Sequence, residues 1–279
     1  MKDLKYETLK PHQIVNHFKN NTELTKKSGL TKNLKNLIFR NIDIDNFYPR
    51  CYDISERNDF EDFMEDFKIT KLISLLKEFS ENSRTENLIS TQKIICCLEI
   101  IERKISEWET PMLSRKFISD KEWAVMSEED TASYRKELEK LERMNKIGFS
   151  NLSKRINTIN SISNNQEQGE LEKDENFVRN VNNEFNNKSN QEIKIYVDEI
   201  LAKLNRIFPQ HALNGKKNIW IMKPSGLSRG RGIKCVSSLN EILLFIKKNS
   251  NQYMVQKYIE NPLLILGRKV FFNLDFKKN

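Results

Sequence analysis

The segment of the sequence that is best equipped for chemistry contains a lysine at the predicted end of a short strand. Residues 218–233 read NIWIMKPSGLSRGRGI. The apolar and aromatic residues before Lys223 are typical of a strand, and Pro224 prevents an ordinary helix from continuing through the next position. A lysine in this place would hold a positive charge at a fixed position.

A basic loop with two glycines follows this lysine. Arg229 and Arg231 alternate with Gly230 and Gly232, and Ile233 begins a second apolar run. Because glycine has no side chain, main-chain N–H groups can approach an anion closely. The order of strand, lysine, loop and strand therefore predicts a phosphate site that suits a nucleoside triphosphate.

Two common phosphate-binding patterns do not fit this loop. The pattern G-x-x-x-x-G-K-[ST] fails because Arg231 stands five positions after Gly226, and the dinucleotide pattern fails because Cys235 occupies the place of its third glycine. For the loop by itself, a solvated turn or a weak RNA-contacting patch is an equal alternative. An RNA-binding protein is the third-ranked interpretation, because few aromatic residues lie near the loop.

The loop is one of a set of motifs. Residues 220–224 read WIMKP, residues 230–233 read GRGI and residues 255–259 read VQKYI. This set resembles the ATP-grasp core of the tubulin tyrosine ligase-like family, in which a W-I-x-K-P strand, a G-R-G-I loop and a V-Q-K-Y-I strand occur together.

Within that family, the chain looks like the tubulin glycylase branch. Residues 228–233 (SRGRGI) and 256–265 (QKYIENPLLI) match this branch. Residues 47–52 (FYPRCY) resemble its upstream F-P-R-C-Y element, with one inserted residue. Other upstream segments agree, so the resemblance spans residues 12 to about 79 and about 192 to 270.

The resemblance implies an ATP-dependent ligase that acts on tubulin. A glutamate side chain in a tubulin tail would be phosphorylated to an acyl phosphate, and the amine of the co-substrate glycine would attack it to form an isopeptide branch. Lys223 would contact the α- or β-phosphate, the loop would close over the phosphates, and residues 256–259 would hold adenine. Arg231 is the candidate catalytic residue; it would face ATP, the acceptor carboxylate or solvent. The candidate nucleotide-binding residues are Lys223, Arg229, Gly230, Gly232, Ile233, Gln256, Lys257, Tyr258, Ile259 and Lys269.

The resemblance also implies Mg²⁺ at the phosphates, and we expect its ligands to be missing from this sequence. Glycylases continue with K-F-D-x-R-Q-W from the position of Lys269 and then with a segment that supplies the magnesium carboxylates. Here the sequence reads VFFNLDFKKN and ends at Asn279; after residue 220 its carboxylates are Glu241, Glu260 and Asp275. We therefore expect an incomplete glycylase. The alternative is a non-catalytic relative that binds nucleotide or microtubules.

The expected fold is α+β, a partial ATP-grasp core preceded by a largely helical region. Residues 1–149 form the helical, glycylase-type region, with apolar spacing that predicts helices over about 60–79 and 94–108. Residues 150–191 are rich in Asn, Ser, Glu and Lys and predict a mostly disordered linker or insertion. Residues 192–279 hold the first part of the ligase core, beginning with a helix that ends before Pro209.

The net charge and the cysteines indicate which binding partners and which cellular compartment to expect. The net charge of +8 favours an anionic partner, and the resemblance favours the acidic tails of tubulin or microtubules over nucleic acid or a membrane. The four cysteines form no CxxC pair or zinc spacing, which predicts a reducing compartment. Cys51 is expected to be a small buried residue and Arg50 to pack or bridge domains. The family suggests the cytoplasm and cytoskeleton, with residence in the cilium or axoneme.

Overall fold

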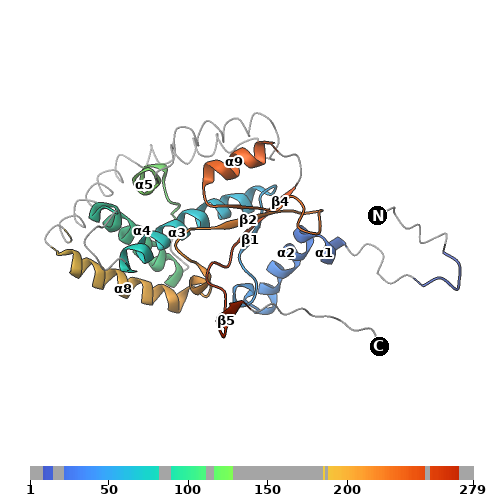
Figure 1. Ribbon diagram of the computed structural model, residues 1–279, viewed down its shortest axis with the longest axis horizontal. Coiled ribbons are helices and arrows are strands. Elements are labelled where there is room, and N and C mark those ends of the chain that lie inside the picture. The colour runs from blue at the N-terminus through green and yellow to red at the C-terminus, as the bar shows by residue number, and fades with distance from the viewer. Residues whose placement is uncertain are drawn as a thin grey trace.

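The protein combines a helical layer with a small antiparallel sheet (Figure 1). The computed structural model describes residues 9–14, 22–81, 89–110, 116–127, 185, 188–248 and 252–269. The expected mixture of helix and sheet is confirmed within these residues. Most of the predicted linker at 150–191 lies outside them. Among the described residues, no helix combines the length and the apolar character needed to cross a membrane.

Three long helices form one side of the molecule, and all three were expected from apolar spacing. These are α3 (Arg57–Glu81), α4 (Thr91–Glu109) and α8 (Asn190–Ile207), and the short helix α5 (Asp120–Met126) packs beside α4. Ser189 begins α8 with a capping box to Glu192, which satisfies main-chain N–H groups that the first turn leaves free. Figure 1 shows α3 running from this helical layer toward the sheet.

The main sheet has four antiparallel strands in the order β1-β4-β2-β3. The strands are β1 (Cys51–Asp53), β2 (Trp220–Pro224), β3 (Lys234–Val236) and β4 (Tyr253–Lys257). The upstream FYPRCY element thus supplies an edge strand, although about 200 residues separate it from β4. Parts of the first and third predicted regions therefore share one sheet.

The remaining elements are short or peripheral. Helix α9 (Leu239–Lys248) follows β3, and the amide of Glu241 donates to the hydroxyl of Ser238, which caps the start of the helix. The others are α1 (Thr22–Thr25), α2 (Lys27–Lys35), η2 (Asn36–Arg40), η3 (Ile44–Asn46), η4 (His211–Leu213), and the hairpin of β5 (Leu264–Ile265) and β6 (Arg268–Lys269).

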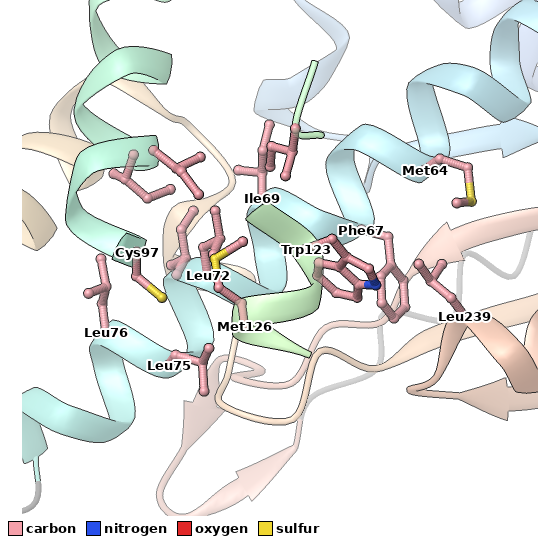
Figure 2. Close-up of a cluster of buried hydrophobic side chains, with 14 of the residues drawn as sticks. Met64, Phe67, Ile69, Leu72, Leu75, Leu76, Cys97, Trp123, Met126 and Leu239 are labelled. Atoms are coloured by element: carbon pink, nitrogen blue, oxygen red, sulfur yellow. The ribbon is translucent and has the colours of Figure 1, made fainter. Parts of the chain in front are cut away.

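The hydrophobic core lies between the sheet and the long helices. Trp220 on β2 is fully buried, with its ring 5.1 Å from that of Phe63 and 6.3 Å from that of Phe67 on α3. Figure 2 shows Trp123 and Met126 from α5 packed among residues of α3 and Cys97 of α4. This packing fixes one face of β2, and therefore the position of every side chain on the strand.

A buried arginine fastens the upstream element to this core. The Nε of Arg50 donates to Asp66 at 2.6 Å, and its guanidinium also donates to Gln210, Thr70 and Asn214. Cys51 is buried too, and its sulfur lies 3.6 Å from the hydroxyl of Thr31. Both residues therefore pack inside the protein, as expected from the sequence.

Candidate functional site

The two faces of the sheet carry different sets of side chains. Side chains alternate along a strand, so β2 directs Trp220 and Met222 to the core and Ile221 and Lys223 to the opposite face. Register places Gln256 of β4 beside Ile221 on that opposite face. We call this the lysine face; its members are Cys51, Asp53, Ile221, Lys223, Cys235, Met254 and Gln256.

Lys223 is held on the lysine face by an uncharged partner. It is the penultimate residue of β2, at the strand end as predicted, and its Nζ donates to Oε1 of Gln256 at 2.6 Å. The amide nitrogen of Gln256 donates to the carbonyl of Pro49 at 3.1 Å, which fixes the side-chain amide. Burial lowers the pKa of Lys223, Lys27 lowers it further, and the thiols of Cys51 and Cys235 act in the opposite direction.

The basic glycine loop follows the end of β2 directly in the chain. Its backbone has positive φ at Arg229 (60°), Gly230 (73°) and Gly232 (71°). At Gly232 an added Cβ would lie 2.9 Å from Cγ of Pro224, so a side chain would push apart the two ends of the loop. The side chains of Arg229 and Arg231 are exposed, and the Nε of Arg231 donates to the carbonyl of Ser228 at 3.3 Å.

A hollow of about 200 Å³ opens beside the start of this loop. It is lined on one side by Lys26, which precedes α2, and on the other by the loop and Gln252. Lys27 at the start of α2 donates to two carbonyls of the loop segment. Four cationic residues, Lys26, Lys27, Arg229 and Arg231, therefore lie at or near a segment that the sequence associates with phosphate binding.

The structure separates Lys257 from the other candidate residues. It faces the core, where its Nζ donates to Glu260 at 2.7 Å and to the carbonyl of Ile219 at 2.8 Å. The main-chain amides of Lys257 and Tyr258 donate to the carbonyls of Arg50 and Ile219. Any contact of Lys257 with adenine would therefore come from its main chain, and the predicted adenine site stays a prediction.

The remaining candidate nucleotide-binding residues are distributed over residues 233–269. Ile233 and Ile259 are partly exposed at 40% and 36%, and Tyr258 is half-buried. Lys269 belongs to β6, in the separate two-stranded hairpin, and its side chain lies outside the described residues. The structure joins Lys223 to Gln256 by a hydrogen bond, and the loop follows β2 in the chain, whereas Lys269 belongs to a separate sheet.

Two important residues have roles that the sequence did not reveal. Glu260 accepts from Lys257 and from the amides of Lys217 and Ile219, so it ties the approach to β2 to the end of β4. Lys27 anchors the glycine loop. The resemblance over residues 12 to about 79 included the segment of Lys27 but gave no reason to connect it with a loop 200 positions away.

A magnesium site is not built by the described residues. They contain no group of three or more His, Cys, Asp or Glu side chains placed to hold a metal ion. Glu241 pairs with Lys234 at 2.6 Å and Glu260 with Lys257 at 2.7 Å, while Asp275 lies outside the description. The described carboxylates of this region therefore serve internal ion pairs, and the residues present do not fit Mg²⁺.

Comparison with known proteins supports the resemblance drawn from the motifs. Residues 149–274 match the model of the tubulin-tyrosine ligase family. The chain is 37% identical over 285 residues to tubulin glycylase 3C of Tetrahymena thermophila, an alignment that covers 96% of this chain and 27% of that protein. It is 30% identical over 271 residues to tubulin monoglycylase TTLL3 of Mus musculus, covering 94% of this chain and 27% of the relative.

A human relative extends the same pattern. Protein monoglycylase TTLL8 of Homo sapiens is 26% identical over 288 residues, covering 95% of this chain and 31% of the relative. The chain thus spans between a quarter and a third of the length of these curated relatives. The similarity includes the upstream element as well as the loop and strands around Lys223, because nearly the whole chain aligns.

Proposed function

We propose that this chain, which belongs to the tubulin-tyrosine ligase family, forms the nucleotide-binding part of a tubulin glycylase. The environment of Lys223 carries the proposal. This lysine is half-buried, its hydrogen-bond partner is the neutral amide of Gln256, and its neighbour Lys27 is also cationic. Holding a lysine in such a place is costly unless an anion compensates its charge. The triphosphate of ATP is such an anion.

The loop supplies the second part of the nucleotide site. Arg229 and Arg231 are exposed and belong to a loop with positive φ at Gly230 and Gly232, where the absence of a side chain would let an anion approach the main chain. In the proposal Lys223 binds the α- or β-phosphate and the loop closes over the phosphates. Arg231 then faces the transferred phosphate or the acceptor carboxylate, where it would stabilise negative charge. Adenine would lie against residues 256–259.

The proposed reaction joins glycine to a glutamate side chain of a tubulin tail. The acceptor carboxylate takes the γ-phosphoryl group of ATP to form an acyl phosphate and release ADP. The amine of glycine then attacks the carbonyl carbon, loses a proton and displaces phosphate. The part played here by the chain's own residues is to bind the phosphates and to neutralise their charge. No step is assigned to Mg²⁺, because the described residues do not build its site.

ATP binding by the purified chain tests the proposal. Isothermal titration with ATP, with and without Mg²⁺, is expected to give a Kd that rises about 10- to 100-fold in Lys223→Met, as for loss of a charge-assisted hydrogen bond. Lys32→Met is the matched control, because Lys32 is an exposed lysine on α2. Equal affinity in both variants, or no ATP binding by the wild type, would overturn the proposed site.

Labelled glycine tests the reaction separately. The chain is incubated with tubulin, ATP and isotopically labelled glycine, and ATP-dependent incorporation that disappears in Lys223→Met would support a glycylase. ATP binding without any incorporation would restrict the chain to the role of a nucleotide-binding part. This outcome is the one expected if the magnesium ligands of the complete enzyme are required for phosphoryl transfer.

The proposed partner is the acidic tail of tubulin, and the proposed location is the microtubule cytoskeleton, including the cilium or axoneme. The net charge of +8 favours such a tail. Co-sedimentation with microtubules is expected to weaken when the tails are removed by subtilisin and when the salt concentration is raised. Microtubule binding that survives Lys223→Met, in a chain that binds no ATP, would instead favour a non-catalytic microtubule-binding relative.

A further inference from the structure

A lysine from the upstream region is hydrogen-bonded to the start of the glycine loop. The Nζ of Lys27, the first residue of α2, donates to the carbonyl of Pro224 at 3.0 Å and to the carbonyl of Leu227 at 2.6 Å. These two carbonyls lie on either side of Ser225 and Gly226, where the chain leaves β2. One ammonium group therefore closes the first turn of the loop.

A second contact beside it strengthens the attachment. The hydroxyl of Ser28 lies 2.7 Å from the hydroxyl of Ser225, which is itself buried. The amide of Ser28 also donates to that hydroxyl, at 3.4 Å. Two consecutive residues of α2 thus hold two consecutive residues of the loop segment, Pro224 and Ser225. Helix α2 is fixed in turn, because it packs against the edge strand β1.

The far part of the loop has less support. Arg229 and Gly230 are exposed, and Gly230 has no neighbouring atom within 4 Å of an added Cβ. The hydrogen bonds within residues 228–233 are short-range, as in the bond of 3.4 Å from the amide of Arg231 to the carbonyl of Ser228. The conformational freedom of this part of the loop therefore depends on how firmly its beginning is held.

We infer that Lys27 is a positioning residue for the glycine loop, so that the upstream helix α2 sets the phosphate-binding conformation of the ligase segment. The inference rests on the proposed nucleotide site, because it concerns the loop of that site. By fixing two carbonyls, Lys27 lowers the number of conformations that the loop must lose when it closes on an anion. The expected loss in Lys27→Ala is therefore in ATP affinity.

The test has one readout that does not require ATP. Trypsin cleaves after Arg229 and Arg231, and under native conditions Lys27→Ala is expected to raise the cleavage rate there about 10-fold, as for loss of a hydrogen bond from a charged donor. Lys27→Arg keeps donors at this position and should restore most of the protection. Lys32→Ala removes an exposed lysine of the same helix and should leave the rate unchanged.

Cleavage in α8 distinguishes loop release from general unfolding. Lys203, which is 39% exposed in its side chain, provides the reference site. Faster cleavage in the loop with an unchanged rate at Lys203 supports the positioning role, whereas parallel acceleration at both places would overturn it. Unchanged loop cleavage in Lys27→Ala would overturn it as well.

ATP titration then connects the anchor with the nucleotide site. A Kd about 10-fold higher in Lys27→Ala, recovered in Lys27→Arg, is the expected result. If the wild-type chain binds no ATP but loop cleavage responds to Lys27 as described, the anchor stands and the proposed nucleotide site fails. If ATP binds and Lys27→Ala leaves its affinity unchanged, the anchor does not serve nucleotide binding and the inference fails.

Discussion

Lys257 and Lys223 lie on neighbouring strands of one sheet and point to opposite faces. Burial lowers the pKa of both. For Lys257 the hydrogen bond and the charge of Glu260 oppose this effect, whereas Lys223 donates to a neutral amide and is repelled by Lys27. Lys257 therefore has a counter-ion within the protein, Glu260, whereas Lys223 has a second cation, Lys27, as a neighbour.

This difference distinguishes a structural lysine from a binding lysine. A buried cation that is fully paired inside the protein has a structural role. Removing it leaves its partner as a buried, unpaired charge, which destabilises the folded state. The charge of a partly buried cation that has no paired anion is neutralised when an anionic ligand binds. Both residues belong to the matched motifs, so the motif alone does not say which of them meets the nucleotide.

Replacing Lys257 should give the largest effect. Lys257→Met would leave Glu260 with the amides of Lys217 and Ile219 alone, and we expect a loss of about 3 kcal/mol in the free energy of unfolding. Lys223→Met should change stability by less than about 1 kcal/mol, because a half-buried charge is exchanged for an apolar group. Urea denaturation measures both; equal losses would remove the distinction between the two lysines.

The buried histidine of η4, His211, tests how strongly the interior disfavours positive charge. Burial, together with the charge of Lys77, lowers the pKa of His211 to about 4. The neutral imidazole is favoured in the folded state, so this stability is present above about pH 6.5 and is lost as pH falls toward 4. The loss amounts to at most about 3 kcal/mol. In His211→Gln the pH dependence of urea denaturation over this range should flatten; an unchanged slope would contradict the assignment.

Substitutions of the two loop glycines should have unequal effects on stability and on ATP binding. Gly232→Ala places a Cβ 2.9 Å from Pro224 at a φ of 71°, whereas Gly230→Ala meets no atom within 4 Å and is strained by its φ alone. We expect Gly232→Ala to cost about 1 to 2 kcal/mol and to weaken ATP binding, with a smaller effect of Gly230→Ala on both. Denaturation and ATP titration check this order. Equal effects would mean that the contact with Pro224 does not shape the loop.

Replacing an exposed arginine should give the smallest effect. Arg231→Gln removes a charge from the surface of the loop, and the Kd for ATP is expected to rise about 2- to 5-fold at low salt. The difference between wild type and variant should shrink as salt is raised, because screening acts on exposed charges. An effect as large as that of Lys223→Met would show that the loop arginine, and not the strand lysine, dominates phosphate binding.

The sequence predicted local elements more successfully than long-range placement. Apolar spacing marked α3, α4 and α8, and the WIMKP segment marked β2, because these signals lie within one element. The pairing of β1 with β4 joins residues 200 positions apart and has no local signature. The partners of Lys257 and the anchor at Lys27 depend on that tertiary arrangement, so they required the structure.

Lysine reactivity with and without ATP tests the central claim most directly. The chain is treated with acetic anhydride, and acetylation at each lysine is measured by mass spectrometry, with Lys32 as the exposed reference. At an ATP concentration about ten times Kd, the reaction at Lys223 should slow about 10-fold, while Lys257 reacts slowly throughout because its side chain is buried. Unchanged labelling of Lys223 under conditions in which ATP binds would contradict the account.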